Sequence, residues 1–287
     1  MKIKTQFTAL FTFLLLSTTF QGCTSEPDPI EDNCGCTDES AQNFNSDANC
    51  DDGSCVFLDD EVKTLNTLFT STGCGGCGVW GVDCHTKYSH EMLDRAIPFE
   101  LHFKYGDPMI NATSDSFVAI ARPRYSPFFA VGLFESMDLA AENRPMICEK
   151  SQERADGFIK NFRDEARNTR IGVSHTIENG KINVHYAYDI EDFEGLQCAL
   201  YILENNIVAT QNAGWRNDVE GWEHQNVVRE AITPVLGKRI LEPKKVGSIS
   251  FSIDENWKQE NLYAAMVIWE PNGPYLPKVV NAEDSME

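Results

Sequence analysis

The chain has 287 residues, and its 44 Asp and Glu outnumber its 24 Lys and Arg, which gives a formal net charge of −20 at pH 7. Proteins that bind nucleic acid neutralise the phosphate backbone with Lys and Arg, so this charge excludes nucleic acid as a partner. Ten cysteines fit a chain that is exported to an oxidising compartment.

The first segment, 1–22, has the pattern of a secretory signal peptide. Two lysines precede an uncharged stretch, 7–20, and a small residue, Gly22, stands before Cys23. The stretch is 14 residues long, whereas a membrane-spanning helix needs about 20 apolar residues. Gly22-Cys23 resembles the end of a bacterial lipobox. We therefore predict that the signal peptide is removed and that Cys23 carries a lipid such as palmitate.

Residues 23–33 read as an acidic tether. They hold four carboxylates and two prolines, and a segment of this composition cannot bury a core and stays solvated. Acidic residues soon after a lipidated cysteine resemble the surface-export signals of Bacteroidota lipoproteins. The expected location is the outer membrane, where the lipid anchor holds the protein on the periplasmic face or at the cell surface.

Residues 34–57 form a small module with four cysteines and almost no core-forming residue apart from Phe44. Disulfides or a metal must therefore hold it together. Two of its cysteines stand too close in sequence to bond each other, so we predict two crossing bridges, each worth about 3 kcal/mol. The favoured pairing is Cys36–Cys55 and Cys34–Cys50. The segment resembles a short cysteine repeat of marine Bacteroidota surface proteins.

The same module carries oxygen side chains in a pattern that is typical of calcium loops. The candidate ligands precede Gly53 and are Asp47, Asn49, Asp51 and Asp52. The glycine falls one place later than in the EF-hand loop, and no bidentate Glu follows. Two interpretations stay open: the side chains bind calcium, or they are solvated and the disulfides alone hold the module.

Residues 58–169 alternate between strand and helix patterns. The predicted elements are strands at 61–70, 97–105 and 128–134, a helix whose apolar stripe runs from Cys77 to Met92, and a helix at 150–168. This order, with two cysteines at a helix start, resembles thioredoxin. It predicts a thioredoxin-like domain.

The Cys74-Gly-Gly-Cys77 motif is suited to thiol–disulfide exchange. Free N–H groups and the dipole of a helix start lower the pKa of the first thiol, so Cys74 would attack and Cys77 would resolve the mixed disulfide. In the thioredoxin superfamily a cis-proline lies beside this pair, and Pro127 occupies the expected place. A glycine pair replaces the proline-containing dipeptide of efficient oxidoreductases. A purely structural disulfide therefore stays an alternative.

The other cysteines and one histidine have open roles. Cys84-His85 could join the motif in a soft metal site, but Cys84 lies on the apolar stripe of the helix, which favours a buried structural cysteine. Cys148 and Cys198 either pair between domains or are buried as small apolar side chains. His224 has no suggestive nucleophile or carboxylate spacing, and we interpret it as an ordinary strand or loop residue.

From residue 170 the hydrophobic period becomes two, which predicts β-strands. Asn179-Gly180 is a strong type I′ hairpin signal, and Asn205-Asn206 indicates a second hairpin. About seven short strands favour an antiparallel β-sandwich, with predicted strands at 171–177, 182–188, 196–203, 207–210, 246–253, 262–269 and 276–282. Trp215 and Trp222 either form an exposed binding patch or close the end of the sandwich.

Several segments together resemble the Omp-twenty-eight-related outer-membrane lipoproteins of Bacteroidota. They are 69–77 around the cysteine motif, His224-Gln-Asn-Val-Val-Arg229, and the pair 264–269 and 279–282. The resemblance spans 62–283 and implies a thioredoxin-like domain followed by a β-sandwich, with no established reaction. Gly78 departs from the family pattern, because proline usually follows the second cysteine.

The predicted organisation is a signal peptide at 1–22, a tether at 23–33, a cysteine-rich module at 34–57, a thioredoxin-like domain at 58–169 and a β-sandwich at 170–287. The sequence favours a lipid-anchored binding or adhesion protein with an unknown protein or surface ligand as its partner. The alternative is a membrane-tethered thiol–disulfide oxidoreductase that uses Cys74 and Cys77. Neither function requires a cofactor, and calcium is the one ion predicted.

Overall fold

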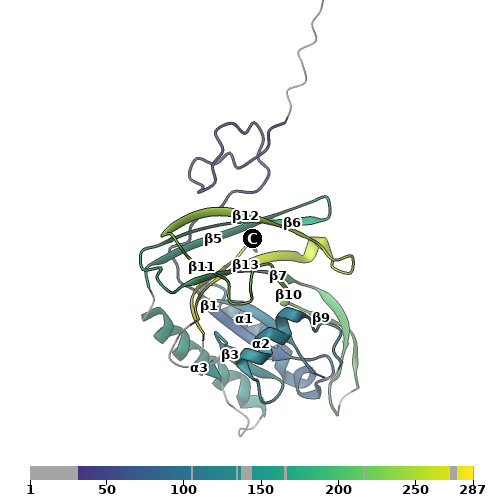
Figure 1. Ribbon diagram of the computed structural model, residues 1–287. Helices are drawn as coiled ribbons and strands as arrows, with labels where there is room; N and C mark the ends of the chain where they lie inside the picture. Colours follow the sequence, from purple (N-terminus) through teal and green to yellow (C-terminus); the bar gives the residue numbers. More distant parts are fainter. Residues whose placement is uncertain are drawn as a thin grey trace, which may run out of the picture. The chain divides into compact units, whose positions relative to one another are not determined.

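The structure, a computed structural model, describes residues 32–104, 106–133, 135–136, 144–164, 167–215, 217–271 and 277–286 (Figure 1). For residues 135–136 and 144–152 only the backbone is described. The predicted signal peptide, Cys23 and the tether up to residue 31 lie outside the described residues. Within the described part of the chain, no helix is both long and apolar enough to cross a membrane.

A mixed sheet of nine described strands runs through both halves of the chain (Figure 1). The first half contributes β1 (Thr64–Thr70), β2 (Ala96–His102), β3 (Phe128–Val131) and β4 (Glu135–Ser136). The second half contributes β7 (Gln197–Glu204), β10 (Val227–Ala231), β11 (Lys238–Arg239), β13 (Leu262–Glu270) and β14 (Lys278–Asp284). The order is β14-β13-β7-β10-β2-β1-β3-β4, with β11 paired to β7.

Strand β10 joins the two halves of the sheet. Val227 of β10 pairs in parallel with Glu100 of β2, and the other edge of β10 pairs with β7. The contact is short: Val227 is the one paired residue, and the Glu100 N–H donates to the Asn226 carbonyl at 2.9 Å. The boundary predicted at residue 169 therefore does not divide two separate sheets.

A three-stranded antiparallel sheet forms a second layer. It consists of β5 (Thr169–Glu178), β6 (Lys181–Ile190) and β12 (Lys244–Ser252), in the order β12-β6-β5. Its buried side chains pack with those of β7, β13 and β14 in one apolar cluster. The predicted hairpin at Asn179-Gly180 is confirmed: both residues have positive φ, 51° and 71°, and join β5 to β6.

The hairpin predicted at Asn205-Asn206 is wrong. Both edges of β7 are already occupied, by β13 on one side and β10 on the other. Strand β8 (Ile207–Gln211) therefore has no free edge beside β7, and it pairs instead with β9 (Val219–His224) in a small sheet of its own. Asn205 and Asn206 are typical turn residues, but strands that are distant in the sequence determine which partner β8 takes.

Helices pack on both faces of the large sheet. On one face, α1 (Val82–Glu91) and α3 (Arg144–Asp164) pack in a cluster that includes Leu68 and Phe129. On the other face, Phe117 of α2 (Ala112–Ala121) packs against aromatic rings of β7 and β13. The sequence patterns do not predict α2.

A capping box begins α2. The Asn111 side chain accepts the Ser114 N–H at 2.9 Å, and the Ser114 hydroxyl accepts the Asn111 N–H at 3.0 Å. Each bond satisfies a backbone donor that the first helical turn leaves free. The box was therefore a readable local signal for the helix.

Candidate functional site

The structure places the cysteine pair directly after β1, at the start of a helical segment. Cys74 and Cys77 form a disulfide with Cα atoms 5.3 Å apart. The Ser126-Pro127 peptide is cis and lies beside this disulfide. The Cys74 Sγ is 3.3 Å from the Ser126 carbonyl oxygen, and the Cys77 Sγ is 3.1 Å from the Ser126 hydroxyl. The fold thus brings Cys74, Cys77 and Pro127 together.

The two sulfurs differ in their surroundings. The backbone N–H of Cys77 points at the Cys74 Sγ from 3.1 Å, and such a donor at a helix start stabilises a thiolate in the reduced form. Cys74 is 6% exposed, whereas Cys77 is 0% exposed. Cys74 is therefore the sulfur that a partner reaches first.

The end of the β8–β9 hairpin is bonded to the cysteine loop. The Asn212 N–H donates to the Thr72 carbonyl at 2.7 Å. The side-chain amide nitrogen of Gln211 lies 3.2 Å from the carbonyl oxygens of both Thr72 and Cys74. These bonds hold the hairpin against the motif and account for the low exposure of its sulfurs.

Gly75 of the motif and Gly78, directly after it, allow this close approach. A Cβ added to Gly75 would lie 2.7 Å from the Gly214 Cα, and a Cβ added to Gly78 would lie 2.2 Å from the Asn212 carbonyl oxygen. No side chain fits at these distances without a shift of the hairpin backbone. The glycines that depart from the usual oxidoreductase pattern thus stand where the hairpin packs.

The two tryptophans of the hairpin have different environments. Trp222 of β9 is partly buried and packs on the apolar cluster that contains Cys74 and Cys77. Trp215, in the loop between β8 and β9, is 74% exposed. Trp222 therefore fills part of the core around the motif and does not close the end of the sandwich, whereas Trp215 presents apolar surface to solvent.

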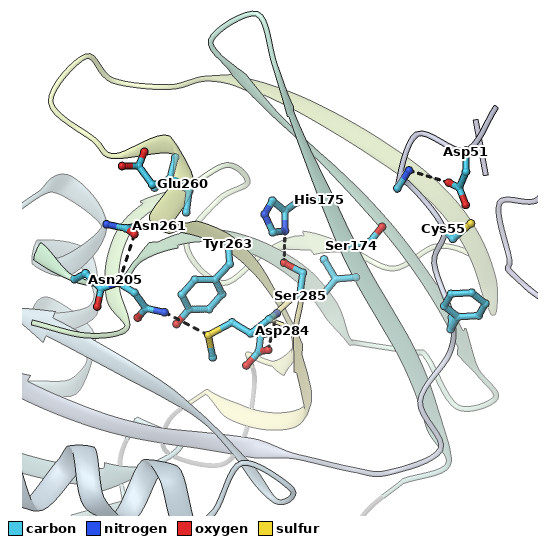
Figure 2. Close-up of a pocket in the computed structure, with 16 residues that line it drawn as sticks. Asp51, Cys55, Ser174, His175, Asn205, Glu260, Asn261, Tyr263, Asp284 and Ser285 are labelled. Carbon is cyan, nitrogen blue, oxygen red and sulfur yellow. Dashed lines mark hydrogen bonds between the residues drawn. The ribbon is translucent and has the colours of Figure 1, made fainter. Parts of the chain in front are cut away.

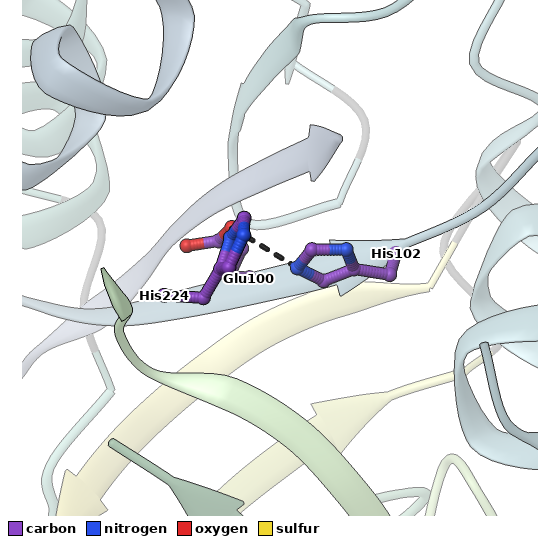
Figure 3. Close-up of side chains that lie close together, drawn as sticks. All are labelled: Glu100, His102 and His224. Carbon is purple, nitrogen blue, oxygen red and sulfur yellow. Dashed lines mark hydrogen bonds and ion pairs between the residues drawn. The ribbon is translucent and has the colours of Figure 1, made fainter. Parts of the chain in front are cut away.

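A buried polar cluster lies on β2 and β9 (Figure 3). Glu100 and His102 stand two positions apart on β2, so their side chains project from the same face of the sheet. His102 Nε2 is 3.1 Å and His224 Nδ1 is 3.3 Å from the same oxygen, Glu100 Oε1. His102 Nδ1 lies 2.8 Å from Oδ2 of Asp107. None of the four residues is more than 5% exposed.

The cluster has strongly shifted pKa values. Burial alone would raise the pKa of Glu100, but hydrogen bonds from both histidines and their charge lower it to about 2. Burial alone would lower the pKa of His102, but its bonds to Asp107 and Glu100 raise it to about 9. Burial opposes the shift at Asp107 as well, and the His102 bond lowers that pKa to about 2. If only protons occupy the cluster, the charged ring of His102 lies between the carboxylates of Glu100 and Asp107.

Asp107 connects the polar cluster to the cysteine loop. Its Oδ2 accepts the Thr72 N–H at 2.6 Å, and its Oδ1 accepts the Met109 N–H at 2.8 Å. The Thr72 N–H therefore donates to Asp107 of the polar cluster, and the Thr72 carbonyl accepts from Asn212 of the hairpin. The two groups of side chains form one connected network.

Sequence reasoning missed this cluster. One signal was available: Glu100 and His102 stand two apart in an otherwise apolar strand, 96–102, where charged groups are rarely buried without partners. His224 was interpreted as an ordinary strand or loop residue, and it instead lies fully buried against Glu100. No sequence pattern links it to β2.

The cysteine-rich module contains both crossing bridges. Cys34 is bonded to Cys50, and Cys36 is bonded to Cys55. The predicted calcium ligands make local bonds: Asp51 and Asp52 each accept the N–H two residues on, Asn49 accepts the Asn33 N–H, and the Asp47 carbonyl accepts from the Asn33 side chain. Calcium binding stays a prediction.

The remaining cysteines do not add to a soft metal site around the motif. Cys84 is disulfide-bonded. Its partner is not among the residues whose side chains are described, and the side chain of Cys148 is not described either. His85 is buried, with Nε2 3.0 Å from the Asn66 carbonyl. Cys198 is a buried free thiol, and burial raises its pKa to about 12.

A cavity of about 840 Å³ lies beside the cysteine-rich module (Figure 2). His175 of β5 and Ser285 meet on its wall, with Nδ1 2.7 Å from Oγ. Tyr263, Asp284 and the exposed ring of Phe57 also line it. Its volume is in the range of sites for small ligands.

Comparison with known proteins gives a fold but no family. No protein-family model matches the chain, and no curated protein matches it. Among solved structures, HBP35 of Porphyromonas gingivalis is similar with a TM-score of 0.62 at 17% identity, over 79% of this chain and 76% of that one. The chain therefore shares its fold with a protein from the Bacteroidota. The resemblance to Omp-twenty-eight-related lipoproteins stays a prediction.

Proposed function

We propose that this chain is an envelope protein of the thioredoxin-like class that exchanges disulfides with partner proteins through Cys74 and Cys77. The observation that carries the proposal is the contact of both sulfurs with Ser126, directly before Pro127. Thiol–disulfide exchange requires an attacking thiolate and a second thiol within its reach. On reduction, the pair at this helix start supplies both, and Pro127 lies beside it.

The topology around the motif supports a thioredoxin-like assignment. Strand β1 pairs in parallel with β2 and antiparallel with β3, and β3 pairs antiparallel with β4. The cysteine motif follows β1, and Pro127 precedes β3. The order of these elements along the chain is the one on which the thioredoxin resemblance rests, and the pairing of the strands supports it.

The exchange runs in two steps. In the reduced protein, the Cys74 thiolate attacks a sulfur of the partner's disulfide, and the other partner sulfur leaves as a thiolate. The Cys77 thiolate then attacks the Cys74 sulfur of this mixed disulfide and releases the second partner thiolate. The partner is reduced by two electrons, and the Cys74–Cys77 disulfide forms. A partner dithiol reverses both steps.

The N-terminal segment would anchor the protein in the cell envelope. Removal of the signal peptide at Gly22 and acylation of Cys23 would hold the module and the motif on a tether at the outer membrane. The charge of −20 and the disulfides of the module are consistent with a folded domain in an oxidising, aqueous compartment.

The reduction potential of the Cys74–Cys77 pair tests this function. It is measured by equilibration with glutathione or dithiothreitol buffers, followed by alkylation of the free thiols. A value above about −250 mV places the pair among exchange-active disulfides, and one below about −300 mV marks it as structural. In parallel, Cys77→Ser should accumulate mixed disulfides with partner proteins, whereas the matched Cys74→Ser variant should not.

A second candidate, a binding lipoprotein on this scaffold, is favoured by the cavity of about 840 Å³ beside the module. The low exposure of the disulfide, 6% and 0% for its two cysteines, is also compatible with a structural role. If the potential lies in the structural range, ligands should be sought at this cavity, with Tyr263→Ala and His175→Ala as the first variants.

A further inference from the structure

We propose that Glu100, His102 and His224 form a buried site for a divalent first-row transition metal, with Zn²⁺ as the best match. One nitrogen or oxygen atom from each residue lies within 4.8 Å of the other two, and all three side chains are buried. Two imidazoles and one carboxylate are a donor set that zinc accepts. The site lies outside the dithiol chemistry proposed above.

The distances inside the cluster fit ligands of one ion. Atoms bound to zinc at about 2.0–2.1 Å in a tetrahedron lie about 3.4 Å from one another. The observed separations to Glu100 Oε1 are 3.1 Å for His102 and 3.3 Å for His224. Charge-assisted hydrogen bonds are shorter, about 2.7–2.9 Å. The two inner contacts are therefore spaced nearly as ligand pairs of one ion, and each would widen by only about 0.1–0.3 Å on ion binding.

Asp107 occupies the place of an outer partner. Its carboxylate lies 2.8 Å from His102 Nδ1, the ring nitrogen that does not face Glu100. Histidines that bind metals commonly donate this second N–H to a carboxylate, which fixes the tautomer and orients the ring. The contact has the length of a strong hydrogen bond, unlike the two inner ones.

The charges of the cluster call for a cation. Glu100 and Asp107 are buried carboxylates, and in the described part of the chain their ion-pair partners are histidines and no Lys or Arg. A dication with two neutral imidazoles balances both carboxylates. The competing arrangement holds a proton on His102 in place of the metal.

Two buried polar atoms beside the cluster lack partners. Neither His224 Nε2 nor Thr70 Oγ1 has a hydrogen bond among the described residues, and both residues are 0% exposed. Thr70 stands in register with His102 on the adjacent strand, so its side chain leaves the same face of the sheet. Three protein ligands leave a fourth position for water, and the Thr70 hydroxyl is placed to bond that water.

Such an ion would be structural. The three ligands are 0–1% exposed, which leaves no path for a substrate. The ion would fasten β9 to β2, and through Asp107 it would also hold the loop of Thr72. It would therefore keep the hairpin in place over the cysteine motif.

The test uses the full mature chain with its disulfides intact, freed of affinity tags. The protein is unfolded in denaturant without reductant, refolded with Zn²⁺, passed through a desalting column, and analysed for metal and for its thermal midpoint before and after chelation. We expect about one zinc per chain, with a fall in the midpoint when the metal is removed. The His224→Ala variant should lose the bound zinc. The matched control His90→Ala, at an exposed histidine, should retain it.

Cobalt substitution identifies the ligands without relying on a variant that folds. The proposed site should give the visible bands of tetrahedral Co²⁺ without the near-ultraviolet band of sulfur ligation. A sulfur band would assign the metal to cysteines and overturn the proposal. So would a folded wild-type chain that retains no zinc and whose midpoint responds to neither zinc nor chelator. A Cys74→Ser chain should bind zinc unchanged, which separates this site from the proposed exchange.

Discussion

Gly78→Ala should both destabilise the protein and open the cysteine motif. The added methyl carbon would lie 2.2 Å from the Asn212 carbonyl oxygen and 2.8 Å from the Gln211 Cγ. Real Cβ atoms keep at least 3.0 Å from such neighbours. The Asn212 carbonyl must therefore retreat by about 0.8 Å, and because it is backbone, the end of β8 moves with it.

The cost follows from the bonds that this movement strains. Asn212 donates to Thr72, and Gln211 donates to the carbonyls around Cys74, and each net bond is worth about 1 kcal/mol. Overpacking of a buried site generally costs about 1–3 kcal/mol. The free energy of unfolding should fall by about 1–3 kcal/mol, unless the hairpin detaches and limits the loss.

Urea unfolding under non-reducing conditions measures the stability, and the rate of reduction by dithiothreitol measures access to Cys74. Gly157→Ala is the matched control, because a Cβ at this helical glycine meets nothing within 4 Å. It should be neutral or stabilising by about 0.5–1 kcal/mol. If Gly78→Ala matches the wild type in both stability and reduction rate, the hairpin does not restrict the motif.

Three further outcomes follow from the described contacts. The Cys198 thiol, with its pKa raised to about 12 by burial, should resist iodoacetamide in the native protein and react after unfolding; native labelling would contradict its placement. Burial raises the pKa of Glu283 from 4.5 to about 7 despite Lys63, so the folded state holds a proton that the unfolded chain releases. This stabilisation is complete below pH 4.5 and is lost as the pH rises through 7. Glu283→Gln should therefore flatten the fall of stability over that window, whereas the exposed Glu178→Gln should leave it unchanged. Replacing Cys36 and Cys55 with Ser should remove about 3 kcal/mol of loop-closure stabilisation, detected as protease cleavage within 34–57; equal resistance to protease would mean that contacts with β5 hold the module.

Local chemistry made much of the fold predictable. The Asn179-Gly180 turn needs two residues that tolerate positive φ, and both adopt it. Strands β13 and β14 follow hydrophobic periods that depend only on neighbouring residues. The helix predicted from Cys77 is α-helical only from Val82, because the segment Cys77–Gly81 is π-helical. The predicted final helix overlaps α3 but begins six residues late.

Local sequence patterns did not predict which strands pair with one another. Asn205-Asn206 reads as a turn, yet β7 has partners on both edges and leaves β8 to form a separate sheet. The period of two shows which face of a strand is buried, but it does not say which strand lies alongside. For this reason the sequence divided the chain at residue 169, whereas β10 continues the sheet across that point.

The sequence by itself determined the chemistry available to this protein: an export signal pattern, a cysteine motif at a helix start, a proline before a strand, and an acidic surface. Only the tertiary structure decided what lies next to that chemistry. It set the hairpin of β8 and β9 on the glycines of the motif, and it brought His224 to Glu100 across 124 residues. Contacts at such separations depend on how the whole sheet is ordered, which no short window of sequence encodes.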